Sequence, residues 1–324
     1  MSQENNNFIS QAVKEVLGSE KEFQKLLQFA DTHPNQPESV RINSLRVNVE
    51  KYIEEAETKG VNFSKIQGSI ADAYYVSMEG SVRKWWNQER LMGKFYSQGN
   101  ASMIPPIYLL GNIQNVENLK VLDMCAAPGS KTTQLGALMR NKGLLVANDY
   151  KSHRLYALHR NLQVFGIANA VVTQLDGRWI SSRWPKTFDR TLLDAPCSGT
   201  GSSRNKLFSH RTEKAISHFQ KKQKGLLTAA INSVKDTEDA YLIYSTCSLL
   251  PHENELLLQP FIEKNVIEVE ELDTSLLSGW QLETGIHQWL DQELSTQLKN
   301  AIRVNPHWND SDAFFIAKLR VIGG

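Results

Sequence analysis

Five short apolar runs alternate with helical patterns between residues 120 and 250, and few folds accommodate such an alternation. Near-continuous apolar strands separated by helices are typical of a parallel sheet with helices on both faces. The predicted strands are residues 120–124, 143–149, 170–173, 188–194 and 240–246. Another apolar run, residues 313–319, is placed to close the sheet. The sequence therefore predicts an α/β fold with a doubly wound, mostly parallel sheet.

A smaller unit precedes this region. Apolar residues at helical spacing predict one or two helices before residue 31, where Pro34 and Pro37 break the pattern. Residues 40–47 and 73–77 are strand-like, and an acidic helix at 52–58 separates them. A chain of 324 residues is long enough for two domains. We expect a helical and small α/β domain at 1–110 and a larger domain at 111–324.

Cysteine content and hydropathy indicate the cellular setting. Three cysteines without a Cys-x-x-Cys pair fit a reducing compartment better than a disulfide scaffold or a zinc module. We assign none of the scattered histidines to a metal. No apolar run approaches the ~20 residues that span a bilayer, and the first 30 residues do not resemble a signal peptide. The sequence predicts a cytoplasmic protein with neither metal nor membrane anchor.

Acidic residues stand at the ends of several predicted strands. Asp123, Asp149 and Asp194 end three of them, and Asp176 follows a fourth by a few residues. A single Asp in this position is most often a helix cap. Because ligands of such sheets bind outside the carboxyl ends of the strands, repetition of the pattern around one sheet predicts a binding edge.

The first loop at this edge, residues 125–131, is a turn of small residues that enters a helix. Small residues let a ligand approach the backbone, and free amides at a helix start attract an anion. The glycine spacing fits neither a P-loop nor a dinucleotide-binding motif, which leaves a carboxylate as the better ligand. Asp149, after the second strand, is placed to accept both hydroxyls of a ribose. A ligand with a carboxylate and a ribose indicates S-adenosylmethionine.

Two of the three thiols, Cys197 and Cys247, follow strands directly at the same edge. A cysteine is most often a small buried hydrophobe, but Pro, Gly and Ser flank both of these on loops. A thiolate that adds to C6 of a pyrimidine activates C5 toward methylation, and a base then removes the C5 proton so that the thiolate leaves. Two thiols and Asp194 in one cleft fit this covalent route, without indicating which thiol attacks. We interpret Cys125 as a structural residue of the tight turn.

Three motifs carry a family resemblance. They are residues 123–132 (DMCAAPGSKT), residues 194–199 (DAPCSG), and residues 245–248 (STCS) followed by 253–255 (ENE). These motifs resemble the signatures of the RNA cytosine-5 methyltransferase family, which includes the RsmB, RsmF and NSUN proteins. Segments 41–46, 95–98 and 313–317 match as well, so the likeness covers roughly residues 40–320. It is strongest to the RsmF branch, bacterial enzymes that act on small-subunit ribosomal RNA.

The resemblance implies a Rossmann-like, class I S-adenosylmethionine-dependent methyltransferase domain and an N-terminal domain that supports it or binds RNA. By the same resemblance, Cys247 would be the nucleophile and Cys197 would assist β-elimination. Asp194 would hydrogen-bond the cytosine edge, which Lys131 would help to hold. Asp149 would bind the ribose of the cofactor and Asp176 its adenine amino group. The residues implied in cofactor binding are Cys125, Ala126, Ala127, Pro128, Gly129, Ser130, Lys131, Asp149, Asp176 and Asp194.

The expected partner is RNA, with small-subunit (16S) ribosomal RNA favoured, either free or in a ribosomal particle, and the protein is expected to be a monomer. The alternatives are a tRNA cytosine-5 methyltransferase and an RNA-binding assembly factor without turnover, although the intact motif residues favour an enzyme. A DNA methyltransferase is disfavoured, because that chemistry usually draws its nucleophile from the Pro-Cys motif.

Two positions depart from the family pattern, since Gly99 replaces an acidic residue and Ala313 a glycine. RsmF proteins also carry an RNA-binding extension after the catalytic domain, whereas this sequence stops at Gly324. Within this sequence, RNA selection is expected to depend on the N-terminal unit, the core or a partner.

Two further segments each allow two interpretations. Trp85 and Trp86, among basic residues, suit either stacking on RNA bases or packing of the N-terminal unit on the core. The Glu253-Asn254-Glu255 segment suits either a helix cap or a role in ordering the Cys247 loop.

The net charge of +1 conceals two oppositely charged regions. Residues 111–235 hold 19 basic and 7 acidic side chains, whereas residues 236–300 hold 2 and 13. We predict that the basic residues of segment 204–224 face RNA phosphates. Charge reversal there should weaken RNA binding and reduce its salt dependence, by about 0.7 in the log–log slope for each phosphate that the protein ceases to neutralise. Unchanged RNA affinity in a salt titration would contradict this prediction. The residues concerned are Arg204, Lys206, Arg211, Lys214, Lys221, Lys222 and Lys224.

Overall fold

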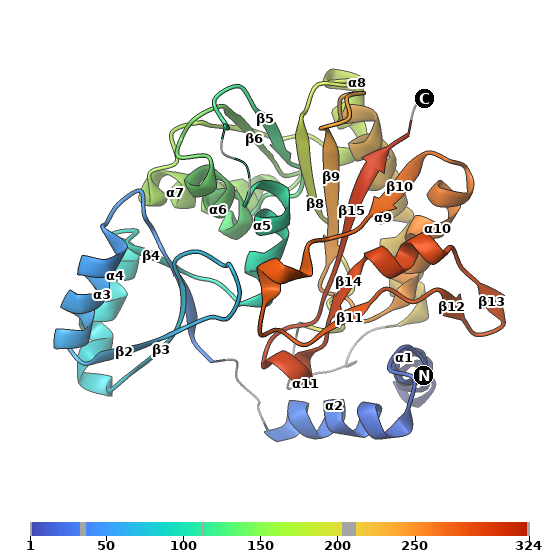
Figure 1. The fold of residues 1–324 in the computed structure, drawn as a ribbon, viewed down its shortest axis with the longest axis horizontal. Helices are drawn as coiled ribbons and strands as arrows, with labels where there is room; N and C mark the ends of the chain where they lie inside the picture. The colour runs from blue at the N-terminus through green and yellow to red at the C-terminus, as the bar shows by residue number, and fades with distance from the viewer. Residues whose placement is uncertain (1, 33–36, 112, 114, 203–211, 323–324) are drawn as a thin grey trace.

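The computed structural model describes residues 2–32, 37–111, 113, 115–202 and 212–322, which form a four-stranded sheet, a nine-stranded sheet and a small two-stranded sheet (Figure 1). The α-helices are α1 Ser2–Val16, α2 Glu20–Thr32, α3 Val49–Thr58, α4 Arg83–Leu91, α5 Ile104–Leu110, α6 Ser130–Leu138, α7 Ser152–Phe165, α8 Ile180–Arg183, α9 Glu213–Ser233, α10 Glu255–Glu263 and α11 Pro306–Asn309. The strands are β1 Ser39–Ile42, β2 Val61–Lys65, β3 Ala73–Met78, β4 Phe95–Ser97, β5 Lys120–Asp123, β6 Leu144–Asn148, β7 Ala170–Thr173, β8 Arg190–Asp194, β9 Tyr241–Thr246, β10 Ile267–Glu270, β11 Leu282–Thr284, β12 Gln288–Trp289, β13 Gln292–Glu293, β14 Ile302–Val304 and β15 Phe314–Val321. Among these described helices, none combines the length and the apolarity needed to cross a bilayer.

The larger sheet has the strand order β11-β14-β15-β9-β8-β5-β6-β7, and β10 also pairs with β15. Strands β5 to β9 are parallel to their neighbours among these five strands, and β15 joins β9 in the antiparallel direction. These strands correspond to the six apolar runs of the sequence, with bounds that differ by at most two residues. The predicted doubly wound, mostly parallel sheet is confirmed.

Helices cover both faces of this sheet. On β5, Val121 belongs to the apolar cluster that includes Ile107 of α5, whereas the next residue, Leu122, belongs to the cluster that includes Leu226 of α9. This alternation follows from the two-residue period of a strand. Both side chains are fully buried, as expected for a strand covered on both faces. Because helices cover both faces, the part of the sheet that stays uncovered for function is the row of loops after the carboxyl ends of the strands.

The N-terminal sheet, in the order β2-β3-β1-β4, is antiparallel throughout and carries α3 and α4. The strand predicted for residues 40–47 is wrong beyond Ile42. The reason is Asn43, whose Oδ1 accepts the N–H of Leu45 and whose amide donates to the carbonyls of Gly93 and Phe165. These bonds replace ladder bonds and turn the chain.

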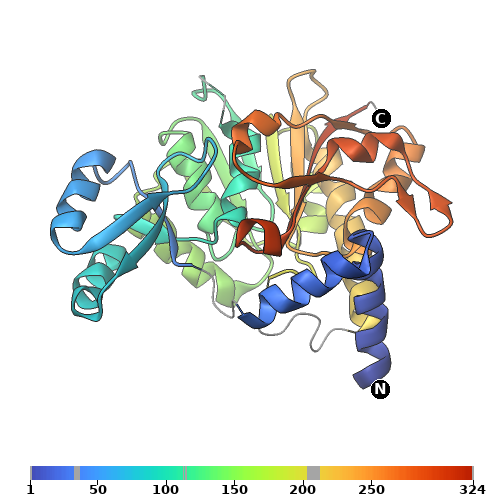
Figure 2. The same cartoon turned by 60° about the horizontal axis from the view of Figure 1, so that its bottom comes forward.

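The first two helices, α1 and α2, pack beneath the larger sheet rather than on the small one (Figure 2). Ile9, Val13 and Leu26 belong to the same buried cluster as side chains of β9 and α9. In addition, the Trp308 indole of α11 donates to Glu22 of α2 at 3.1 Å. The division of the chain at residue 110 stays a prediction.

Five short strands between residues 267 and 304 were not predicted from the sequence. Each has two to four residues with mixed polarity, and β10, Ile-Glu-Val-Glu, places acidic side chains between its two apolar ones and after them. Such segments lack the apolar run on which the prediction relied. The pairing of β10 and β14 depends instead on β15, their common partner.

Trp86 lies in the core of the N-terminal unit, where it is 1% exposed and stacks on Phe95 with 3.9 Å between the ring centroids. Its indole N–H donates to Glu38 at 3.0 Å. The role of Trp86 is therefore packing and not stacking on RNA bases. It packs inside the N-terminal unit and not between this unit and the larger sheet.

We predict that Trp86→Ala lowers the free energy of unfolding by about 3–5 kcal/mol, because it leaves a large cavity. Trp85→Ala, at the half-buried neighbour, is the matched control and should cost about 1 kcal/mol. Urea denaturation followed by fluorescence measures both. Equal costs would mean that the stacked ring does not support the unit.

Candidate active site

Parallel pairing brings the loops that carry the motifs to one edge of the sheet. Asp194 at the end of β8 pairs with Ser245 of β9, and Asp123 at the end of β5 pairs with Ala147 of β6. The loops after these strands therefore begin next to one another. The predicted residues thus gather at one edge of the sheet, and their role in binding stays a prediction.

Asp123 has an internal role at this edge. It is 1% exposed and accepts a hydrogen bond from the Thr132 hydroxyl at 2.7 Å. Burial raises the pKa of Asp123 to about 7, although the bond from Thr132 acts in the opposite direction. Gly129, at the start of α6, has a φ of 110°, which favours glycine, and a Cβ there would lie 3.1 Å from Leu158. Asp123 thus fastens the turn at residues 125–131 to the sheet.

Asp149 is held beside this turn. One carboxylate oxygen accepts a hydrogen bond from the N–H of Ala127 at 3.3 Å and forms an ion pair with Arg154 at 3.1 Å. The other oxygen accepts a hydrogen bond from the N–H of Lys151 at 3.0 Å. Arg154 also donates to the carbonyl of Ala127. The side chain of Arg154 thus links the first two loops.

A cavity of about 460 Å³ opens between the loops after β5, β6 and β7 and the helix α9. Its lining includes Cys125, Asp149 and Asp176, three of the ten residues expected to bind the cofactor. The other seven expected residues do not line it: residues 126–131 form the turn beside it, and Asp194 lies with the cysteines. The complete lining is Met124, Cys125, Asn148, Asp149, Tyr150, Lys151, Arg154, Asp176, Gly177, Arg178, Pro196, His218, Lys221, Lys222 and Leu226.

Asp176 forms a bidentate pair with Arg178, whose Nη2 lies 2.6 Å from the carboxylate. This bond lowers the pKa of Asp176, so its carboxylate remains an acceptor. Sequence reasoning missed Arg178, because an arginine two residues after an acid carries no motif. It also missed that Lys221 and Lys222 of α9 line this cavity.

The basic residues of segment 204–224 lie in different surroundings. Lys214, Lys221 and Lys224 are exposed on α9, and of the basic residues in this stretch Lys221 and Lys222 line the cavity described above. Arg204, Lys206 and Arg211 lie outside the described residues. Charge reversal at Lys214 and Lys224 therefore tests RNA binding without altering the cavity, and the expected position of this stretch against RNA phosphates stays a prediction.

Lys131 and Asp194 form a partly buried ion pair next to the cysteines. Their charged atoms are 2.7 Å apart, and Lys131 itself is 8% exposed. Lys131 also donates to the Ser102 hydroxyl at 3.0 Å, and Ser245 donates to the other oxygen of Asp194 at 2.9 Å. The ammonium lies 5.1 Å from the centre of the Phe314 ring. Both predicted side chains are thus fixed at the carboxyl edge.

The thiols of Cys197 and Cys247 lie within hydrogen-bond distance, with 3.2 Å between their sulfur atoms. Both side chains are partly exposed, whereas the serines that follow them, Ser198 and Ser248, are fully buried. The loops therefore present the sulfur atoms and bury their polar neighbours. Cys125 is separate from the pair and lines the cavity described above.

The environment of the two thiols is asymmetric. A hydrogen bond from Cys197 lowers the pKa of Cys247, and the charge of Lys131 adds to this effect. The same bond, together with burial and the charge of Glu253, raises the pKa of Cys197 well above its usual range. Cys247 is therefore the thiol that ionises more readily, a distinction that sequence reasoning did not make.

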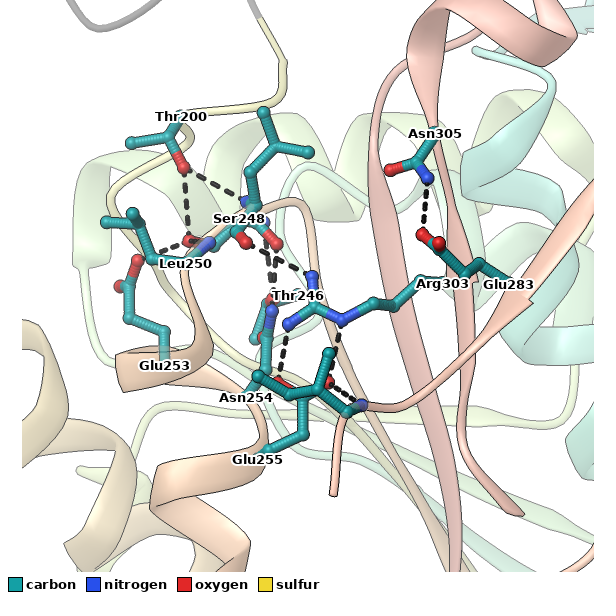
Figure 3. Close-up of polar contacts among 12 residues, drawn as sticks. Thr200, Thr246, Ser248, Leu250, Glu253, Asn254, Glu255, Glu283, Arg303 and Asn305 are labelled. Carbon is teal, nitrogen blue, oxygen red and sulfur yellow. Dashed lines mark hydrogen bonds and ion pairs between the residues drawn. The ribbon is translucent and has the colours of Figure 1, made fainter. Parts of the chain in front are cut away.

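Polar side chains hold the loop that carries Cys247 (Figure 3). Asn254 accepts from the Thr246 hydroxyl at 2.6 Å and donates to the carbonyl of Ser248 at 2.9 Å. Glu255 forms a fully buried pair with Arg303 of β14, and Arg303 also donates to the carbonyl of Leu249. Of the two interpretations of this segment, the ordering of the Cys247 loop is the one confirmed.

Known proteins are similar to this chain in sequence and in fold. A model of the 16S rRNA methyltransferase RsmB/F family matches residues 110–320. The ribosomal RNA small subunit methyltransferase F of Shewanella piezotolerans is 34% identical over 328 residues, which cover 99% of this chain and 65% of that protein. The protein of the same name from Vibrio parahaemolyticus is 33% identical over 287 residues, 87% of this chain and 56% of its own length. The chain thus spans between 54% and 65% of the curated relatives that it matches.

Solved structures agree. A crystal structure of a methyltransferase homologue from Pyrococcus horikoshii superimposes with a TM-score of 0.79 and 30% identity, covering 96% of this chain and 94% of that one. The structure of NSun6 with SFG from the same organism has a TM-score of 0.78 over 98% of both chains, at 22% identity. The predicted Rossmann-like methyltransferase fold is confirmed.

We predict that Cys197→Ala shifts alkylation of Cys247 to higher pH, because the hydrogen bond that stabilises the thiolate is lost. Lys131→Met should shift it in the same direction by a smaller amount, since its charge is the lesser contribution. Iodoacetamide rates at the Cys247 peptide, measured by mass spectrometry against pH, test both variants. Lys142→Met, on the exposed surface, serves as the control. A shift to lower pH in Cys197→Ala would contradict the asymmetry.

Proposed function

The chain belongs to the RsmB/F family of 16S rRNA methyltransferases, and we propose that it methylates C5 of a cytosine in RNA, with small-subunit ribosomal RNA as the substrate. The observation that carries this proposal is the pair of sulfur atoms 3.2 Å apart beside the Lys131–Asp194 ion pair. C5 of cytosine becomes nucleophilic only after a group adds to C6, and a thiolate is suited to that addition. Methylation of an oxygen or an exocyclic amine requires no thiol.

The cavity beside the first loop fits S-adenosylmethionine, which when bound supplies an electrophilic methyl group. Asp149, held by the N–H groups of Ala127 and Lys151, is assigned to the ribose hydroxyls. Asp176 keeps acceptor oxygens for the adenine amino group. The turn at residues 126–131 is assigned to the methionine carboxylate, because it leads into the N-terminus of α6.

Cys247 is the nucleophile in this proposal. Its thiolate forms an S–C6 bond, and the electron pair of the C5=C6 bond then forms the bond from C5 to the methyl group. That methyl group would come from the sulfonium of the bound cofactor, which would keep the electrons of its S–CH₃ bond and leave as a neutral thioether. Lys131 and Asp194 hold the cytosine edge and stabilise the charge that develops on the ring. Cys197 supports the thiolate through the bond between the two sulfur atoms before addition.

Release of the enzyme requires the reverse change at C6. A base removes the C5 proton, the electron pair restores the C5=C6 bond, and the S–C6 bond breaks to return the Cys247 thiolate. We assign Cys197 to this elimination, since it is adjacent to the sulfur that leaves. Cys197 therefore acts twice, on the Cys247 thiolate before addition and in the elimination that releases it.

The RNA substrate is tested most directly in cells. We propose ribosomal RNA, free or in a particle, as the partner of a monomeric cytoplasmic enzyme that needs no metal. Bisulfite mapping of RNA from a strain that lacks the protein should show the loss of one 5-methylcytosine in small-subunit rRNA. Loss of a methylated position in tRNA would instead identify the tRNA enzyme, and no loss in a chain that binds RNA would support an assembly factor.

We predict that Cys247→Ala lowers the rate of RNA methylation by about 10³-fold or more, the order expected when a nucleophile is removed. Cys197→Ala should instead accumulate a covalent RNA–protein adduct, because addition proceeds and elimination does not. Transfer of labelled methyl groups measures the first effect, and denaturing gel electrophoresis measures the second. Normal turnover in Cys247→Ala, or an adduct-free and active Cys197→Ala, would show that the roles are assigned wrongly.

A further inference from the structure

Glu253, in the short helix η5 (Pro251–Glu253), lies between the two loops that carry the thiols. It is 0% exposed, and donors from three separate segments converge on its carboxylate. From the Cys197 loop, Ser198 donates both its backbone N–H, at 2.8 Å, and its hydroxyl. From the Cys247 loop, the Ser248 hydroxyl donates at 2.6 Å, and Gln223 of α9 donates at 3.1 Å. One side chain thus bonds to the residue that follows each thiol.

The charge of Glu253 is supported by hydrogen bonds alone. None of the ion pairs in the described part of the chain includes it, in contrast to Glu255, which pairs with Arg303. Four donors on two oxygens match the acceptor capacity of a carboxylate. Burial of a charge is costly without such bonds, and these four donors compensate for it.

We propose that Glu253 is the positioning residue that holds Cys197 and Cys247 at the separation that both addition and elimination require. The proposal rests on the function proposed above for its catalytic consequence, but the geometry that it explains exists without substrate. Ser198 and Ser248 are the two points at which the carboxylate acts. Its influence on the position of the thiols is transmitted through these two serines.

Electrostatics support the same assignment. The negative charge of Glu253 favours the protonated form of Cys197, in the same direction as the hydrogen bond to Cys247 and burial. A neutral residue at position 253 would remove this contribution.

Other bonds join the two loops, so loss of Glu253 should displace the thiols without unfolding the site. Gly201 donates its N–H to the carbonyl of Cys247 at 3.1 Å, and its own carbonyl accepts from Ala313 at 2.9 Å. The Thr200 and Ser248 hydroxyls lie 3.1 Å apart. Glu253 is the member of this network that bonds to the segments beside both sulfur atoms and carries a charge.

The test uses Glu253→Gln and phenylarsine oxide, a trivalent arsenical that binds tightly only when two thiols can bridge its arsenic. Gln has the same length but places an amide NH₂ where one carboxylate oxygen accepts the serine hydroxyls. We expect about tenfold weaker arsenical binding and about tenfold lower kcat, the cost of losing bonds to a charged acceptor. The KM for S-adenosylmethionine should stay unchanged, because Glu253 does not line the cofactor cavity.

Two controls separate positioning from general stability. Cys197→Ala leaves only one thiol of the pair, so it gives the affinity for the arsenical when no second thiol can bridge the arsenic. Glu89→Gln is the matched change at a buried glutamate of the N-terminal unit, whose carboxylate pairs with Lys94 and lies outside both thiol loops. It should lower the melting temperature but leave arsenical binding to the folded fraction near the wild-type value.

The outcomes are distinct. Wild-type arsenical affinity and kcat in folded Glu253→Gln would overturn the proposal. If that variant does not fold, Ser198→Ala, which removes one hydroxyl donor to the carboxylate, should still weaken arsenical binding by about threefold, and no change there would overturn it as well. A wild-type protein that binds the arsenical in a Glu253-dependent manner but transfers no methyl group to RNA would refute the proposed function while supporting the positioning role.

Discussion

The parallel pairing of β8 with β9 is the constraint on which the rest of the site depends. Parallel strands in register end at the same edge of a sheet, so two loops fifty residues apart in the chain begin side by side. The pairing is held by buried strand residues such as Leu192 and Ile243, which are far from any chemistry. The bonds between the loops come second: Gly201 bonds to the carbonyl of Cys247 only because both loops already start at adjacent positions. Precise placement of two small sulfur atoms thus begins with ordinary strand packing.

The sequence was sufficient to predict the central sheet because its buried strands are continuous apolar runs of the length expected for strands, separated by helical patterns. It was not sufficient for strands β10 to β14, whose short and mixed sequences acquire their structure from pairing with neighbours. The early end of β1 has a comparable cause. Asn43 terminates that strand through bonds to residues 93 and 165, and partners so distant in the chain leave no trace in a local pattern.

The properties of the site likewise fall into those that the sequence predicted and those that it did not. Motifs located the acidic residues and the cysteines, since each stands at the end of a strand or within three residues of it. They did not show that Asp123 fastens the first turn through Thr132, that Arg178 binds Asp176, or that one thiol ionises more readily than the other. These properties depend on burial and on which groups face each other across loops. A titration behaviour created by interactions between distant segments becomes visible only when the segments are placed in space.

The buried hydrogen bonds beneath the two thiol loops have a consequence for protein engineering. The two cysteine motifs are short and look portable, but the groups that shape them come from η5, from α9 and from β14. Transfer of the two cysteine motifs alone to another methyltransferase sheet would leave the serines of both loops without their common acceptor. The smallest transplantable unit is therefore the two loops with the segment after β9 and the helix behind them, and a new substrate is better sought by changing the surface around this unit than by moving it.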